Sequence, residues 1–258
     1  MKNFSWKITG TGKINLILLH GWGINSKIWY YIVQELKIFF KIHLIDFPGF
    51  GKNKNLHPLH IDDIINLLHT YMPKNAIWIG WSIGGLIASQ YALKYPMNIL
   101  GIITVSSSPC FLSKKNWPGI KKNFLDILCK NLITNYYKTI NNFLSYNTIH
   151  TLQSTQEINI LKNILLSQPK PSLNTIKYGL NTLCTSDLCL QIRYIKKPFL
   201  RIYGNLDVLV PIKIAYILNN QCLYSSSIII NNASHLPFIS HKKIFCLYLL
   251  KFVKKITD

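Results

Sequence analysis

Ala76-Ile-Trp-Ile-Gly-Trp-Ser-Ile-Gly-Gly85 is the stretch that decides the fold of this 258-residue chain. Its first four residues have the β-branched and aromatic character of a buried strand, and apolar residues at helical spacing follow as far as Tyr95. Between them lies Gly-x-Ser-x-Gly, the pattern of a sharp strand-to-helix turn. Such a turn predicts a strained, exposed Ser82, with glycines where side chains would strike the neighbouring strand and helix. An ordinary tight turn has the same pattern, so residues elsewhere in the chain must show whether Ser82 is a nucleophile.

Two further polar side chains follow predicted strands and complete a hydrolytic set. A serine hydroxyl needs a base to take its proton, and His235 comes directly after the last apolar strand,. Asp207, in Tyr203-Gly-Asn-Leu-Asp207, follows the strand before it. Because sites in open α/β sheets form at the carboxyl ends of strands, we predict Ser82 as nucleophile, His235 as base and Asp207 as the acid that orients it.

The stretch Leu18-Leu-His-Gly-Trp-Gly23 ends an early strand, where the backbone must turn close to the nucleophile. We predict that the backbone N–H groups of Trp22 and Ile83 form an oxyanion hole, since two such donors stabilise a tetrahedral intermediate. His20 is expected to support this loop rather than to transfer protons.

Apolar runs of strand length alternate with helical patterns along most of the chain. Strands are predicted at 14–19, 41–46, 76–81, 99–106, 198–203 and 227–230, and helices at 60–71, 83–95 and 243–253. This alternation predicts an α/β fold with a mostly parallel sheet flanked by helices. Between residues 110 and 194 no strand pattern occurs. We therefore expect a core of residues 1–110 and 195–258, with 111–194 inserted as a helical cap over the carboxyl edge of the sheet.

The charge balance is strongly basic, at 29 basic and 9 acidic residues, or +20. The lysines are scattered over the whole chain, and no zinc-finger, RNP or recognition-helix pattern occurs among them. We interpret the charge as a compositional bias rather than as a specific nucleic-acid site. An acidic protein partner stays open, because a field of this sign attracts polyanions.

Location and metal content follow from similar reasoning. The N-terminus shows no secretion signal and the apolar runs are shorter than a membrane span, so we expect a cytoplasmic protein without membrane contact. Six cysteines at irregular spacing suit buried free thiols better than a disulfide framework or a metal site,. We expect no metal and no other cofactor, and a monomer.

Seven short motifs together resemble the α/β-hydrolase carboxylesterases, and within them the pimeloyl-[acyl-carrier protein] methyl ester esterases of biotin synthesis. They are His20-Gly-Trp-Gly23, Asp46-Phe-Pro-Gly-Phe-Gly51, Gly80-Trp-Ser-Ile-Gly-Gly85, Ser107-Ser-Pro-Cys110, Trp117-Pro-Gly-Ile120, Tyr203-Gly-Asn-Leu-Asp207 and Ser234-His-Leu-Pro-Phe-Ile-Ser240. The resemblance spans nearly the whole chain. It implies hydrolysis of a pimeloyl methyl ester still attached to acyl carrier protein, with release of methanol and without a cofactor.

The same resemblance implies which residues bind the substrate. The acyl pocket would be framed by Trp22, Ser82, Ile83, Phe143, Leu144, Ser145, Tyr146, Asn147 and His235, although packing within the cap is the competing interpretation for the cap residues. The family holds the carrier protein with cap arginines, and this chain keeps a basic residue at one such position, Lys138. Asn142, Thr155 and Asn159 occupy the others, and lysine lacks the bidentate fork of arginine. Carrier binding would then rest on diffuse charge from Lys114, Lys115, Lys121, Lys122, Lys130 and Lys162.

Two other functions stay open at this point. A broad-specificity short-chain carboxylesterase or thioesterase would use the same scaffold, because a fold does not fix its substrate. A noncatalytic binding protein that keeps the scaffold is the second alternative, and the complete set of Ser82, Asp207 and His235 disfavours it.

Overall fold

The computed structural model describes residues 3–146, 148, 154–167 and 169–257. A seven-stranded sheet runs through its centre in the order β1-β3-β2-β4-β5-β6-β7. The strands are β1 (Lys7–Thr9), β2 (Ile14–Leu19), β3 (Phe40–Ile45), β4 (Ala76–Trp81), β5 (Ile99–Val105), β6 (Phe199–Gly204) and β7 (Ser225–Ile230). All neighbours pair in parallel except β1, which runs antiparallel to β3 at one edge. The predicted α/β fold is confirmed.

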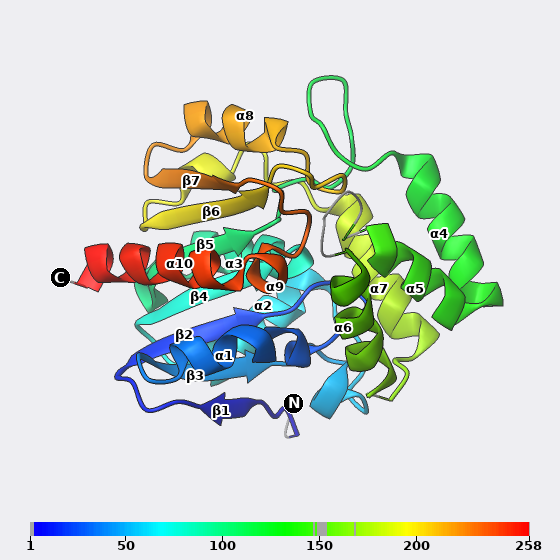
Figure 1. Ribbon diagram of the computed structural model, residues 1–258, viewed down its shortest axis with the longest axis horizontal. Coiled ribbons are helices and arrows are strands. Elements are labelled where there is room, and N and C mark those ends of the chain that lie inside the picture. Colours follow the sequence, from blue (N-terminus) through cyan, green and yellow to red (C-terminus); the bar gives the residue numbers. More distant parts are fainter. Residues whose placement is uncertain (1–2, 147, 149–153, 168, 258) are drawn as a thin grey trace.

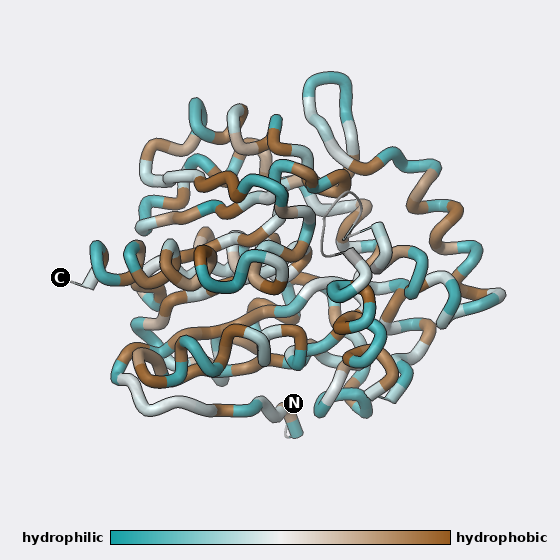
Figure 2. The backbone as a smooth tube through the Cα atoms, viewed as in Figure 1, coloured by the Kyte–Doolittle hydropathy of each residue, from teal (hydrophilic) through white to brown (hydrophobic). Residues whose placement is uncertain are grey.

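The inner strands are apolar because helices cover both of their faces. Every residue of β4 and β6 is buried, and the inner strands appear as brown segments at the centre of Figure 2. One face carries α1 (Tyr30–Leu36), α9 (Pro237–Ser240) and α10 (Lys242–Thr257), which pack on one another, while α2 (Ile61–Tyr71) packs beside α3 (Ile83–Lys94) on the other (Figure 1). Helix α8 (Lys213–Gln221) contacts β7.

The described residues between β5 and β6 form four α-helices: α4 (Lys122–Thr134), α5 (Tyr136–Tyr146), α6 (Ser154–Leu166) and α7 (Leu173–Thr185). They lie beyond the carboxyl ends of the parallel strands (Figure 1). We refer to them as the cap. The boundaries 111–194 for this insertion stay a prediction.

The six predicted strands are present with ends shifted by at most two residues. Strand β1 was not predicted, because three partly exposed residues carry too short an alternation to detect,. No helix within the described ranges has both the length and the apolar character needed to cross a bilayer.

Candidate active site

Ser82 sits at the tip of the turn that joins β4 to α3. Its backbone has φ 55° and ψ −122°, a left-handed φ that a serine rarely adopts,. The end of β5 and the loop after it hold it there: the Ser82 N–H donates to the Val105 oxygen at 3.0 Å, and the Ser107 hydroxyl donates to the Ser82 oxygen at 2.7 Å. The backbone N–H and C=O of Ser82 are thus both fixed.

The two glycines that flank this turn are required by the space around them. A Cβ atom on Gly80 would lie 2.1 Å from the Gly84 carbonyl oxygen, and a Cβ atom on Gly84 would lie 2.5 Å from the Leu19 oxygen. Neither backbone oxygen can move without breaking the strand or the helix that it belongs to. Glycine therefore permits the close packing of α3 against β2 and β4.

Asp207 and His235 form a buried pair at the ends of β6 and β7. His235 Nδ1 lies 2.8 Å from Asp207 Oδ2, and both side chains are almost fully shielded from solvent. The other carboxylate oxygen, Oδ1, accepts the N–H groups of Leu209 and Val210, each at 2.9 Å. The indole N–H of Trp81 donates to the His235 carbonyl oxygen at 2.8 Å. These contacts satisfy the carboxylate and fix the loop that carries the imidazole.

His20 holds the loop that follows β2, as the sequence predicted. The Phe47 N–H donates to His20 Nε2 at 3.1 Å, so the ring proton lies on Nδ1, which donates to the Gly21 oxygen at 2.8 Å. Burial lowers the pKa of His20, against an opposing effect of Asp46, and keeps the ring neutral. Because C=O and N–H of one trans peptide point in opposite directions, this bond turns the Trp22 N–H away from His20.

A small cavity brings several of the predicted residues together. Its lining includes Trp22, Ser82, Phe143 and His235, with Trp81, Phe111, Ile120, Leu183 and Leu209 around them. Its volume of about 10 Å³ leaves room for no more than one water molecule,. Among the described hydrogen bonds none joins Ser82 to His235, a contact that is often long before substrate binds. We call this space the catalytic cavity.

The predicted acyl-pocket residues divide into three groups. Phe143 reaches the catalytic cavity and meets the Trp22 ring edge-on, with centroids 4.9 Å apart. The Ile83 side chain instead lines a neighbouring cavity with His20 and Trp22, and only its backbone N–H, at the start of α3, remains for the predicted role,.

Two other predicted cap residues, Ser145 and Tyr146, make contacts outside the catalytic cavity. The Ser145 hydroxyl donates to the Asn141 oxygen one helical turn away, at 2.9 Å. Tyr146 is exposed and packs edge-on against Phe124. Leu144 lies within α5, and Asn147 falls outside the described residues. Of Phe143, Ser145 and Tyr146, only Phe143 lines the catalytic cavity.

A groove of about 400 Å³ runs between α4 and α5, outside the catalytic cavity. Exposed Lys138 lines it, and Phe143 forms part of its wall as well as part of the wall of the catalytic cavity. We call it the α4–α5 groove. Its lining residues are Phe124, Ile127, Leu128, Asn131, Thr134, Asn135, Lys138, Thr139, Asn142, Phe143 and Tyr146.

Several residues of the site were not singled out from the sequence. Ser107 belongs to the motif Ser107-Ser-Pro-Cys110, and its hydroxyl donates to the Ser82 carbonyl oxygen. Leu183 and Leu209 line the catalytic cavity without any polar signal that could have marked them. One group of side chains among the described residues, Cys110, Asp187 and Cys189, brings potential metal-ligating atoms together, and it does not line this cavity.

Comparison with known proteins identifies the family. Residues 14–242 match the family described as alpha/beta hydrolase fold. The pimeloyl-[acyl-carrier protein] methyl ester esterase of Wigglesworthia glossinidia brevipalpis is 44% identical over 257 residues, which cover 99% of each chain, and that of Proteus mirabilis is 41% identical over 252 residues, 97% of each.

Solved structures agree on the fold. An esterase from Exiguobacterium antarcticum superposes with a TM-score of 0.83 at 20% identity, covering 96% of this chain and 94% of that one. A bromoperoxidase from Bacillus anthracis gives 0.84 at 20% identity, with coverage of 96% and 94%. The chain therefore belongs to the α/β-hydrolase fold family and, within it, to the pimeloyl-[acyl-carrier protein] methyl ester esterases.

Proposed function

We propose that this chain hydrolyses the methyl ester of a pimeloyl group carried on acyl carrier protein, releasing methanol in biotin synthesis. One observation carries the proposal: His235, which is paired with the buried Asp207, lines the same cavity as Ser82. The curated relatives that match nearly the full length bear the name of this activity. A serine, a histidine and an acid hydrolyse an ester without a metal or cofactor.

In the proposed mechanism Ser82 attacks the ester carbonyl while His235 accepts the hydroxyl proton. Asp207 keeps the imidazole oriented through Nδ1, and its own charge is stabilised by the two backbone N–H groups on Oδ1,. His235 then protonates the departing methoxide. Water repeats the cycle on the acyl-enzyme and frees the acid.

The Trp22 and Ile83 N–H groups would stabilise the developing oxyanion. Ile83 is the first residue of α3, where a backbone N–H has no acceptor within the helix and the helix dipole favours negative charge,. Trp22 is held by His20 through the Gly21 carbonyl, and its indole N–H donates to the Ile176 oxygen of the cap at 3.0 Å. Both donors would therefore be in place before the substrate arrives.

The acyl arm would reach Ser82 from the α4–α5 groove. The catalytic cavity is too small for an ester, and Phe143 separates it from the groove. Displacement of the Phe143 ring would join the two spaces. Lys138, on the groove, would meet the acidic carrier protein there. We also propose that the protein is a monomer in the cytoplasm. Its six unpaired cysteines agree with a reducing compartment,.

The decisive experiment compares two ester substrates on the purified chain. We expect a higher kcat/KM for pimeloyl-acyl carrier protein methyl ester than for p-nitrophenyl butyrate, with Ser82→Ala inactive on both. The chain should also restore biotin-independent growth to a bacterium that lacks its own esterase. Turnover of the carrier-bound ester that Ser82→Ala does not reduce would refute the proposal.

A broad short-chain esterase is the second candidate, favoured by the size of the catalytic cavity. A short ester would need less displacement of Phe143 than a pimeloyl arm does. A preference for p-nitrophenyl butyrate over the carrier-bound ester, combined with failure to rescue growth, would support this second function instead.

A further inference from the structure

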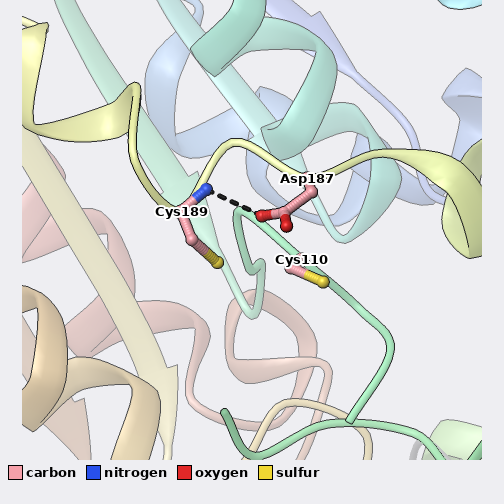
Figure 3. A group of neighbouring side chains, drawn as sticks. All are labelled: Cys110, Asp187 and Cys189. Atoms are coloured by element: carbon pink, nitrogen blue, oxygen red, sulfur yellow. Dashed lines mark hydrogen bonds between the residues drawn. The ribbon is translucent and has the colours of Figure 1, made fainter. Parts of the chain in front are cut away.

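Two cysteines far apart in sequence meet where the cap joins the core. Cys110 follows β5 at the start of the insertion, and Cys189 follows α7 at its end. Cys110 and Asp187 face each other in an isolated antiparallel bridge. The two Sγ atoms and a carboxylate oxygen of Asp187 all lie within 4.8 Å of one another (Figure 3). The pair therefore spans both connections between cap and core.

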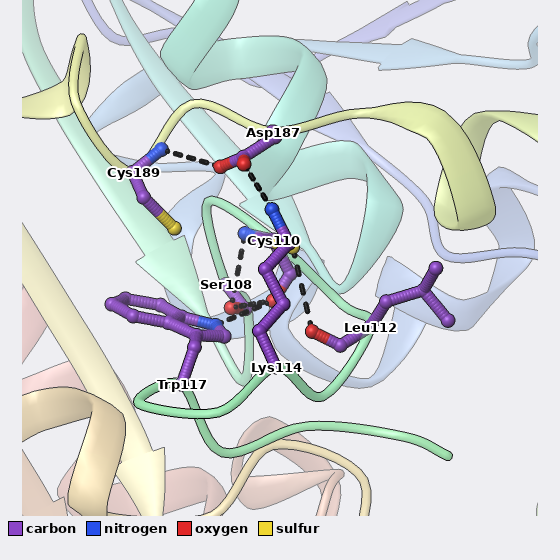
Figure 4. A network of polar contacts seen from close by, with 7 residues as sticks. All are labelled: Ser108, Cys110, Leu112, Lys114, Trp117, Asp187 and Cys189. Atoms are coloured by element: carbon purple, nitrogen blue, oxygen red, sulfur yellow. Dashed lines mark hydrogen bonds and ion pairs between the residues drawn. The ribbon is translucent and has the colours of Figure 1, made fainter. Parts of the chain in front are cut away.

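A network of hydrogen bonds fixes the backbone on each side of this pair. Trp117 donates its indole N–H to the Cys110 oxygen at 2.8 Å, and the Cys110 N–H donates to Ser108 Oγ at 3.2 Å. Across the junction, the Cys189 N–H donates to Asp187 Oδ1 at 3.0 Å (Figure 4). These backbone contacts hold the two sulfur atoms near each other, and the Cys110 thiol itself donates to the Leu112 oxygen at 3.4 Å.

Lys114 makes this cluster a poor site for a metal ion. Its ammonium group forms an ion pair with Asp187 Oδ2, where a metal would bind (Figure 4). A chain of net charge +20 also disfavours a second cation and favours a thiolate,. The electrostatics therefore point to sulfur chemistry rather than to metal binding.

The two thiols differ in how readily they ionise. Interaction with the neighbouring Cys189 thiol lowers the pKa of Cys110 to about 7, with a smaller contribution from Lys114, while burial and the Asp187 carboxylate oppose this shift. The same interaction and burial raise the pKa of the Cys189 thiol. A thiolate next to a protonated thiol is the arrangement of a nucleophilic cysteine with its resolving partner.

We propose that Cys110 and Cys189 form a reactive dithiol site that hydrogen peroxide converts into a disulfide. Cys110 is 2% exposed, which favours an oxidant of this size over a bulky disulfide. Asp187 and Lys114 have side chains 42% and 49% exposed, and they mark the solvent side of the cluster.

The reaction proceeds in two balanced steps. The Cys110 thiolate attacks one peroxide oxygen, the O–O bond breaks, and the departing hydroxide takes a proton to leave as water. The Cys189 sulfur then attacks the sulfur of the resulting sulfenic acid, the S–O bond breaks, and hydroxide leaves with the Cys189 proton as a second water. Two thiols lose two electrons in total, and one peroxide gains them.

The new bond would tie the start of the cap to its end. It would close residues 110–189 into a covalent loop that contains α4, α5, α6 and α7. A loop of this length loses considerable freedom in the unfolded state, so the Tm should rise by roughly 5 to 10 °C.

The test uses the purified full chain with equimolar hydrogen peroxide. Remaining thiols are alkylated, and peptides are mapped by mass spectrometry without reduction. We expect a peptide joining Cys110 to Cys189 that dithiothreitol separates, and a Tm that rises with it. Cys189→Ser should abolish both, and Cys184→Ser, which removes another partly buried thiol outside the cluster, should abolish neither.

Three results would overturn the proposal. These are absence of the linked peptide, oxidation of Cys110 to sulfinic acid without linkage, and stoichiometric zinc binding to the reduced chain that Cys189→Ser removes. Cys189 is only partly buried, so this variant should fold, and its unperturbed circular dichroism spectrum would verify that. Because the readout is a covalent mass, it does not depend on the proposed esterase activity.

Discussion

The loops after β2 and β7 each present a buried histidine, and the two rings differ in what their nitrogens contact. Both nitrogens of His20 bind backbone groups, the Gly21 oxygen and the Phe47 N–H. His235 binds a carboxylate, Asp207, through Nδ1, while its ring lines the catalytic cavity. Burial is nearly equal, at 0% and 2% exposed. The bonding partner, rather than burial, therefore separates a ring that supports a loop from one that can carry a proton.

Removal of the His235 ring should have the largest effect. His235→Ala leaves Ser82 without a base, so kcat for the carrier-bound ester should fall by about 10⁵-fold or more. The measurement is single-turnover hydrolysis followed by mass spectrometry, with the Tm as a control for folding. If a folded variant kept more than a few per cent of the rate, His235 could not be the base.

Asp207→Asn tests whether the carboxylate sets the state of the His235 ring. Asparagine preserves the shape but cannot stabilise the imidazolium, so kcat should fall by roughly 10³- to 10⁴-fold with little change in KM. The N–H groups of Leu209 and Val210 can still bond to the amide oxygen. A fall of less than tenfold, measured under the same assay, would mean that Asp207 serves only the loop.

His20 should behave as a positioning residue. His20→Ala frees the Gly21 carbonyl, so kcat should fall by about 10- to 100-fold, less than for complete loss of an oxyanion donor. His20→Asn can donate from the position of Nδ1 and should retain more of kcat than His20→Ala. Equal losses in both variants, or a change confined to KM, would contradict this role.

A third histidine, His43, gives the smallest effect and concerns stability alone. The Trp6 indole donates to its Nδ1 at 3.1 Å, and Nε2 lies 2.9 Å from Asn15 Oδ1. Burial, with a contribution from Lys41, lowers the pKa of His43 to about 4. In the unfolded chain the pKa of His43 is about 6.5, so below that pH the unfolded chain binds a proton more readily than the folded chain does. The stability that neutral, buried His43 contributes is therefore fully present above pH 6.5 and is lost as pH falls toward 4.

The measurement for His43 is urea unfolding at pH 7 and pH 5. The free energy of unfolding should fall by about 2 kcal/mol more between these values in the parent chain than in His43→Gln. An identical fall in both proteins would assign the acid sensitivity to other groups, such as His20.

The sequence was sufficient for the parts of the molecule that depend on local pattern. Buried parallel strands are continuous apolar runs, so Ile14–Leu19 and Ala76–Trp81 were predicted with their observed ends,. Ser82, Asp207 and His235 each follow a strand, and parallel strands end at the same edge of the sheet. Their convergence was therefore predictable without coordinates.

Contacts between distant segments could not be predicted in the same way. Phe143 and Tyr146 are one helical turn apart in α5, and only the packing of α4 and α5 decides that the first faces the catalytic cavity. The approach of Cys189 to Cys110 depends on how the whole cap folds back onto the core, so the spacing of the cysteines in the sequence does not predict it. The support of His20 by Phe47 likewise joins two separate loops.

The left-handed backbone of Ser82 has a consequence for protein engineering. A serine held at φ 55° costs about 1 to 3 kcal/mol of folding free energy, a penalty that glycine avoids,. Ser82→Gly would then withstand heat better than the parent while losing its nucleophile. Directed evolution that scores heat resistance alone would enrich inactive chains, so every round needs a turnover screen beside it.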